Sequence, residues 1–181
     1  MRIVMIRHAK VNMKWEQSYD SRSFDRACLE YDKKKIVFEG KDNIQIGNYE
    51  KIYISDLSRT YETACKLFGE RNFVKMSLIN EVPLKSFKDT IHKYPLWLWN
   101  FLGRIQWFLG NKRQSEGIAD TEARAQLFID ILEKENVDCC VVTHGFFMRV
   151  LIRELKKRGY RIKQSKGFKI SNLDEVTAEK E

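Results

Sequence analysis

The chain has 181 residues, of which 43% are apolar and 12% aromatic. This length and composition indicate one globular domain over residues 1–181 and exclude a disordered or low-complexity chain. Lys and Arg outnumber Asp and Glu by 33 to 25, and the net charge of +8 favours anionic ligands. The apolar stretch 96–109 is too short to span a membrane. The four cysteines lack metal-ligand spacing and no signal peptide precedes them, which favours reduced thiols and a cytoplasmic location.

The chain begins with a predicted buried strand. Residues 3–6 are apolar at every position, which is typical of a strand covered on both faces of a sheet. Arg7 and His8 follow it directly, and a polar loop over 10–19 leads to a helix over 21–34. The apolar stripe of that helix consists of Phe24, Ala27, Cys28 and Tyr31. A second, short helix is predicted over 39–47 and a strand over 51–55.

The next predicted helix places an arginine beside a strand end. Ser55 or Asp56 is expected to cap it, and Gly69 ends it. Arg59 lies in its first turn, where a cation opposes the helix dipole and gains by meeting an anion. An ion pair of Arg59 with Glu62 or Asp56 is the alternative. The buried face is predicted to contain Leu57, Tyr61, Ala64 and Phe68.

A strand is predicted over 73–79, with Glu81 just after it. Residues 85–117 differ from the rest, because Trp97, Trp99 and Trp107 alternate there with basic side chains. One or two helices are expected, with an apolar stripe of Trp97, Phe101, Ile105 and Phe108, widened by Leu98, Leu102 and Leu109. We expect the stripe to pack on the core; a substrate cap, a dimer surface and a membrane-surface helix are the alternatives.

The C-terminal part repeats the alternation of helix and strand. A helix is predicted over 120–135, a buried strand over 138–143 and a helix over 146–158, with a last strand within 168–176. His144 follows the buried strand, as His8 follows the first one. The inward residues of the 120–135 helix are predicted to be Ala123, Leu127, Ile131 and Leu132.

The alternation predicts an α/β fold with a mainly parallel sheet. The carboxyl ends of parallel strands meet at one edge, so this edge is expected to gather Arg7, His8, Arg59, Glu81 and His144. Two His and two Arg without an acidic cluster make a poor metal site. They suit a phosphoryl group, because guanidinium forks bind phosphate oxygens and a neutral imidazole can attack phosphorus. An acid must then protonate the leaving alkoxide.

These motifs resemble the histidine phosphatase superfamily, the phosphoglycerate mutase-like proteins. Arg7-His8-Ala9 resembles the Arg-His-Gly signature of that family. The segment 55–64 resembles its Ser-x-Leu-x-Arg-x-x-x-Thr-Ala motif, and Thr143-His144-Gly145 resembles its third motif. The resemblance spans residues 1 to about 175 and implies a three-layer sandwich, with helices flanking the central sheet and a helical, cap-like insertion at about 85–117.

The resemblance also implies roles for the residues in these motifs. His8 would be the nucleophile that becomes phosphohistidine, and Arg7, Arg59 and His144 would hold the phosphoryl oxygens. Glu81 matches the proton donor of the family, with Glu116 as a second candidate. No cofactor and no metal are implied.

The resemblance favours a metal-independent phosphomonoesterase of the histidine acid phosphatase type. Val11 and Lys14 depart from the family pattern beside the nucleophile, and the chain is shorter than the mutases, so hydrolysis is favoured over mutase activity. A phosphomutase and a non-catalytic binding module for a phospholigand or partner on the same fold are the alternatives. The expected substrate is a phosphorylated small molecule, with a phosphopeptide as a further possibility. No recognition motif for nucleic acid is apparent, and the oligomeric state stays open.

Overall fold

The structure is a computed structural model that describes residues 1–39, 47–164 and 170–180. Its centre is a six-stranded sheet with the strand order β6-β5-β8-β1-β10-β9. Strands β6, β5, β8 and β1 run parallel, whereas β10 is antiparallel to both β1 and β9. The bounds are β1 (Arg2–Arg7), β5 (Lys51–Ile54), β6 (Val74–Lys75), β8 (Cys139–Thr143), β9 (Arg161–Gln164) and β10 (Glu175–Glu179).

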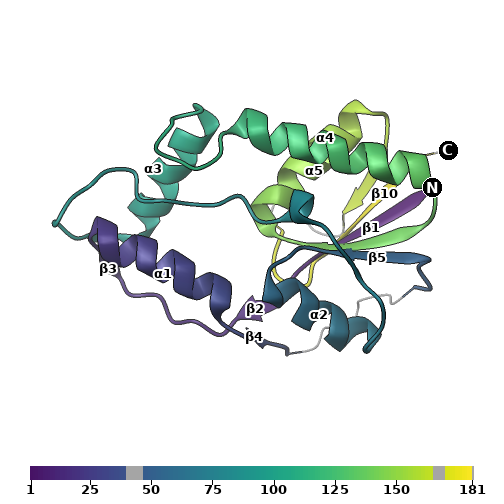
Figure 1. Ribbon diagram of the computed structural model, residues 1–181, viewed down its shortest axis with the longest axis horizontal. Helices are drawn as coiled ribbons and strands as arrows, with labels where there is room; N and C mark the ends of the chain where they lie inside the picture. The colour runs from purple at the N-terminus through teal and green to yellow at the C-terminus, as the bar shows by residue number, and fades with distance from the viewer. Residues whose placement is uncertain (40–46, 165–169, 181) are drawn as a thin grey trace.

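Helices cover both faces of this sheet, so the α/β, three-layer prediction is confirmed (Figure 1). Helices α4 (Ile118–Glu135) and α5 (Gly145–Lys157) lie on one face, and α2 (Ser58–Phe68) lies on the other. Helices α1 (Ser21–Lys33) and α3 (Leu96–Phe108) lie beyond the end of the sheet, far from the two chain termini. The carboxyl ends of the parallel strands point toward α1 and α3.

Two short strand pairs connect the loops at the end of the molecule that contains α1 and α3. Strand β2 (Lys10–Val11) pairs with β4 (Ile36–Val37), and β3 (Ser18–Tyr19) pairs with β7 (Tyr94–Pro95). The segment predicted as a polar loop over 10–19 therefore contains two short strands. The second of these pairs holds the start of α3 beside the start of α1, across a long separation in sequence.

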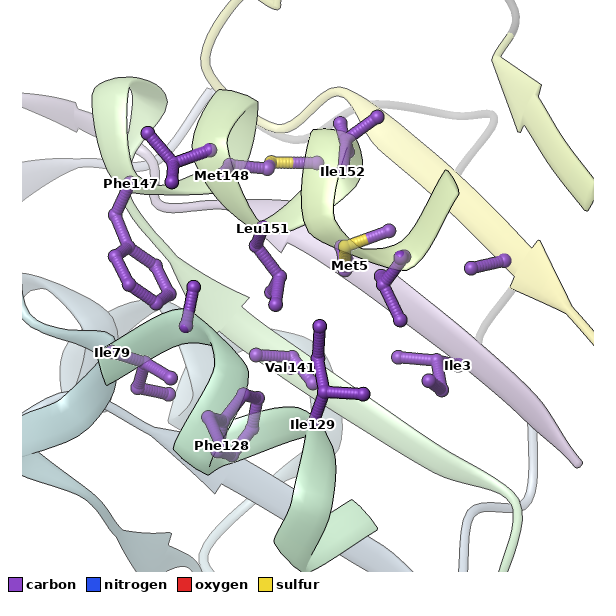
Figure 2. Packing of buried hydrophobic residues seen from close by; sticks show 14 of the residues in the cluster. Ile3, Met5, Ile79, Phe128, Ile129, Val141, Phe147, Met148, Leu151 and Ile152 are labelled. Atoms are coloured by element: carbon purple, nitrogen blue, oxygen red, sulfur yellow. The ribbon is translucent and has the colours of Figure 1, made fainter. Parts of the chain in front are cut away.

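The largest apolar cluster fills the space between the sheet and the α4–α5 layer (Figure 2). Strands contribute Ile3, Met5 and Val141, and helices contribute Phe128 and Leu151 from α4 and α5. A second cluster packs α2 on the opposite face of the sheet. A third joins α1 to α3 around the stacked rings of Phe24 and Trp99, whose centroids lie 5.2 Å apart. Each buried apolar side chain contributes about 1.5–3 kcal/mol to folding.

Several helices and strands predicted from the sequence agree closely with the structure. The first strand, the 21–34 helix, the 51–55 strand, the 138–143 strand and the 146–158 helix all lie within a residue or two of their predicted bounds. The predicted 73–79 strand is only Val74–Lys75 followed by a 3-10 turn at Ser77–Ile79. The last strand lies at Glu175–Glu179 rather than within 168–176, and β9 was not predicted. The predicted 39–47 helix falls almost wholly outside the described residues.

The predicted faces of α2 and α4 were partly wrong. Tyr61 is exposed, while Arg59, Thr60 and Thr63 are buried, because the first turns of α2 face a polar site. Ala64 and Leu67, further along the helix, pack in the second apolar cluster. In α4, Leu132 is buried as predicted, but Ala123 and Leu127 are exposed. The other buried residues of the helix are Thr121, Ala125, Phe128 and Ile129. The N-cap prediction for α2 was also wrong, since the N-cap is Leu57 with no side-chain cap.

The prediction that the α3 stripe packs on the core was wrong. Trp97, Phe101 and Phe108 are exposed, whereas Trp99, Gly103 and Trp107 face inward. The helix is apolar on nearly every side, so hydrophobic periodicity alone could not choose between the two faces. Gly103 lies against Leu84, and an added Cβ there would come within 2.6 Å of a Leu84 methyl carbon.

Candidate active site

His8 lies at the carboxyl end of β1, beside His144 at the end of β8. The register pairs Arg7 with Thr143, so the two histidines leave adjacent parallel strands side by side. The His8 amide donates to the Thr143 carbonyl at 2.9 Å, and the two imidazole centroids are 5.0 Å apart. Both rings are buried.

The imidazole of His8 is held in one tautomer. Its Nδ1 lies 2.7 Å from the carbonyl oxygen of Ala9. A carbonyl can only accept, so Nδ1 carries the proton and the Nε2 lone pair stays free. The Ala9 amide in turn donates to Thr63 Oγ1 at 3.0 Å, which ties this loop to α2. The arrangement presents Nε2 as a neutral nucleophile or base.

His144 is held between a hydroxyl and a guanidinium. Its Nε2 lies 2.7 Å from Ser55 Oγ, and its Nδ1 accepts from Arg59 Nε at 3.2 Å. Ser55 Oγ also lies 2.9 Å from Thr60 Oγ1. The Ser55 hydroxyl therefore serves the site rather than the helix cap that the sequence predicted. Because Nδ1 accepts from Arg59, the neutral imidazole of His144 carries its proton on Nε2, which donates to Ser55 Oγ.

Burial and neighbouring cations keep both imidazoles neutral. Burial, then the Arg59 guanidinium and Arg7, lowers the pKa of His8 from 6.5 to about 3, against the opposing effect of the Ala9 hydrogen bond. Burial, the neighbouring His8 and the cationic Arg59 hold the pKa of His144 well below its usual range. A neutral His8 at physiological pH is the form that can act as a nucleophile.

Arg7 brings an unsatisfied donor into this cluster. Its Nη1 donates to the Ile170 carbonyl at 2.7 Å, while its buried Nε has no partner among the residues that the structure describes. The guanidinium lies against Gly145, where an added Cβ would sit 3.1 Å from the Arg7 Cζ. Glycine at 145 thus leaves room for Arg7, and an anion would satisfy the buried donor.

Arg59 has an anionic partner that the sequence analysis missed. Its side chain is only 1% exposed and its Nη1 donates to Asp32 Oδ1 at 2.7 Å, so neither Glu62 nor Asp56 is its partner. The ring of Tyr31 lies 5.1 Å from the guanidinium carbon. Tyr31 belongs to the predicted stripe of the first helix, and Asp32 follows it directly. The stripe could thus have indicated that the last turn of this helix reaches the site.

Glu81 lies at the N-terminus of α5, which begins one residue after His144. Its Oε1 accepts from the Phe147 amide at 3.0 Å, and its Oε2 lies 3.4 Å from the Phe146 nitrogen. The Val82 amide donates to Oε1 as well, at 3.0 Å. A helix N-terminus favours a carboxylate through its free amides and its dipole. These contacts fix Glu81 beside the histidine cluster.

Glu116, the second candidate acid, forms an ion pair with Arg124. Its Oε1 accepts from Arg124 Nη2 at 2.9 Å and from the Thr121 hydroxyl. Arg124 also donates to the carbonyls of Leu78 and Asn80, and so braces the segment that leads into Glu81. Of the two carboxylates, Glu81 has the more direct connection to His144.

A cavity of about 670 Å³ opens between α1, α3 and this strand edge. Arg59, Asp32, Glu81 and Glu116 are among its lining residues, whereas His8 and His144 are not. Apolar side chains share the walls with Lys85, Arg104 and Arg124. The space has the size of a small-molecule pocket.

Among residues 1–39, 47–164 and 170–180, no group of three or more His, Cys, Asp or Glu side chains is placed to hold a metal ion. Over the same residues no helix combines the length and the apolar character needed to cross a membrane. The four cysteines are free thiols, and Cys139 and Cys140 are buried in β8.

Comparisons with known proteins agree with the fold. The family model of the histidine phosphatase superfamily (branch 1) matches residues 41–177, and the chain therefore belongs to this superfamily. A phosphoserine phosphatase from Entamoeba histolytica, solved with 3-phosphoglyceric acid, is similar in structure with a TM-score of 0.62 at 18% identity, over 97% of this chain and 89% of that one. No curated protein matches the chain in sequence.

Two mycobacterial structures are similar as well. The product of an open reading frame from Mycobacterium tuberculosis has a TM-score of 0.62 at 15% identity, over 99% of this chain and 91% of that one. A mycobacterial glucosyl-3-phosphoglycerate phosphatase has a TM-score of 0.56 at 17% identity, over 97% and 88%. At these identities the likeness establishes a shared fold.

Proposed function

We propose that the protein hydrolyses a phosphomonoester through a phosphohistidine at His8. The observation that carries the proposal is the hydrogen bond between His8 Nδ1 and the Ala9 carbonyl, which leaves Nε2 free in a cluster of two arginines and a second histidine. Phosphoryl transfer depends mainly on charge stabilisation and in-line positioning, and two arginines beside a neutral imidazole are suited to stabilising the charge. Membership of the superfamily and the phosphatases among the structural relatives support the same reaction.

In the first step, His8 Nε2 attacks phosphorus as the bond from phosphorus to the leaving oxygen breaks. Arg7, Arg59 and His144 hold the phosphoryl oxygens, and the buried, unpartnered Nε of Arg7 is a donor suited to one of them. Glu81 in its acid form gives its proton to the leaving alkoxide. In the second step, Glu81 takes a proton from water, the water oxygen attacks phosphorus, and the N–P bond breaks to release phosphate and restore His8.

The substrate that we propose is a phosphorylated small molecule. The cavity has the volume of a small-molecule pocket, and both charge signs line it: Asp32 and Glu116 face it together with Arg104 and Lys85. Residues 85–117 act as a cap in this proposal, since Asn100, Arg104 and Glu116 contribute to the cavity wall. A cytoplasmic location stays a prediction.

The test is hydrolysis of p-nitrophenyl phosphate in the presence of EDTA. We compare wild type with His8→Ala and with His92→Ala, which removes an exposed imidazole outside the site. The proposal predicts metal-independent activity that His8→Ala abolishes and His92→Ala retains. Equal activity in the His8 variant would contradict the role of His8. Inactivity of all three, together with phosphate binding, would favour a binding module, and isomerisation without net hydrolysis would favour a mutase.

A further inference from the structure

Helix α3 presents an uncharged apolar row to solvent. Trp97, Phe101, Ile105 and Leu109 follow one another at four-residue spacing, and Phe108 lies beside them; we call these five residues the α3 row. Their exposed fractions are 65%, 58%, 38%, 73% and 61% in the order just given. Residues four apart form one continuous ridge along a helix. Figure 1 places α3 at the periphery of the molecule, beyond the end of the sheet.

Among the residues that the structure describes, none covers this row in the single chain. The opposite side of α3 already packs inward through Trp99, Gly103 and Trp107. The only charged residue of the helix, Arg104, is half-buried and lies 3.8 Å from the ring centroid of Phe146. The row is therefore an apolar surface free of charge on a protein whose net charge is +8.

The exposed area of the row is close to the apolar share of one half of a dimer interface. An aromatic side chain has roughly 150–250 Å² of surface, so the exposed parts of three aromatics amount to about 350 Å². Ile105 and Leu109 raise the total to roughly 500 Å², at the upper end of the largest patches found on monomers. A standard interface buries about 800 Å² per partner, of which roughly 60–65% is apolar. The row alone supplies that apolar share.

The spacing is also self-complementary. When two copies of α3 cross antiparallel at the level of residue 103, Trp97 of one copy meets Leu109 of the other, and Phe101 meets Ile105. A two-fold axis repeats both contacts, which is the isologous pattern of symmetric dimers. A hollow of about 470 Å³ adjoins the Leu109 end, with Phe108, Gly110 and Ile118 among its lining residues. This hollow offers space for the indole of Trp97 from the second copy.

We propose that the α3 row is the interface of a homodimer. The occupant is a second copy of this chain, because an uncharged ridge can face itself without repulsion between like charges. A membrane surface fits less well, since helices that lie on membranes carry Lys and Arg on their polar face, and the other face of α3 is packed into the protein. Helix α3 also contributes Asn100 and Arg104 to the cavity wall. A dimer contact through the α3 row would therefore stabilise the cap beside the site.

The test measures the oligomeric state of the full chain by sedimentation velocity from low to high micromolar concentration. We compare wild type with Phe101→Glu, which places two carboxylates at the centre of the interface. Leu127→Glu, on α4, introduces the same charge at a side chain that is 56% exposed and lies outside the row. Desolvating the new carboxylates is expected to weaken the dimer at least a hundredfold in Phe101→Glu and to leave it intact in Leu127→Glu.

Three outcomes would overturn the proposal. A wild type that stays monomeric at high micromolar concentration has no such interface, and a dimer that survives Phe101→Glu uses another face. Binding of monomeric wild type to vesicles of anionic phospholipid, lost in Phe101→Glu, would assign the row to a membrane. If Phe101→Glu unfolds by circular dichroism, Trp97→Lys at the end of the row replaces it with the same expected loss.

Discussion

Acidification should destabilise the protein through its buried histidines. The pKa of His8 is lowered from 6.5 to about 3 by burial and by Arg59, so the unfolded chain binds a proton at a pH where the folded chain does not. Stability supplied by the neutral form is complete above 6.5 and is lost as the pH falls toward 3. At about pH 5 the loss through His8 alone comes to about 2 kcal/mol. His144 changes in the same direction.

Urea unfolding at pH 7 and pH 5 measures this loss. Carboxylates also titrate between pH 5 and pH 7. Wild type is therefore compared with His8→Gln, which retains every carboxylate and lacks only the imidazole of His8. The account expects the variant to lose about 2 kcal/mol less than wild type between the two pH values. His92→Gln controls for the removal of an exposed imidazole and should retain the wild-type loss. Equal losses in wild type and His8→Gln would refute the neutral, buried state assigned to His8.

Three further variants address other contacts of the site. Asp32→Asn removes an anion that competes for Arg59, and should tighten inorganic phosphate binding about fivefold in a calorimetric titration. Glu81→Gln should slow hydrolysis of alkyl phosphates about 10²–10⁴-fold, and that of p-nitrophenyl phosphate less, because its leaving group needs little protonation. Gly145→Ala pushes a methyl group against Arg7 and should lower kcat/KM about tenfold with the fold preserved.

Matched controls separate these effects from general damage to the cavity. Asp25→Asn removes a carboxylate from the same helix and the same cavity, but its hydrogen-bond partner is Ser86 rather than an arginine. It should leave phosphate affinity unchanged. Glu116→Gln removes the other candidate acid and should not reproduce the leaving-group dependence expected for Glu81→Gln. Weaker phosphate binding in Asp32→Asn would mean that Asp32 holds Arg59 in place instead of competing for it.

The strand ends could be predicted from sequence because two strong signals agree there. Short apolar runs indicate buried strands, and in a parallel sheet the residues that follow them must meet at one edge. His8 and His144 are placed side by side for this reason alone. The hydrogen bonds of Ser55 with His144 and of Asp32 with Arg59 could not be predicted, because they depend on how separate elements pack against one another.

Helix faces were less predictable wherever apolar residues occupy several sides. In α3, both the 97–101–105 row and the 99–103–107 row are apolar. The second is buried, where Trp99 stacks on Phe24 and Gly103 lies against Leu84. In α2, the inner face carries Thr60 and Thr63 because it meets the polar site. Propensity and hydrophobicity do not encode such a face, since tertiary contacts decide it.

Detection of the covalent intermediate tests the central claim most directly. Phosphohistidine is lost in acid, so wild type mixed with p-nitrophenyl phosphate is quenched in alkali and digested, and its peptides are examined by mass spectrometry. The account predicts a phosphoryl group on His8 in wild type, accumulating further in Glu81→Gln and absent in His8→Ala. Hydrolysis with no phosphoryl group on any peptide, or with one on another residue, would contradict it.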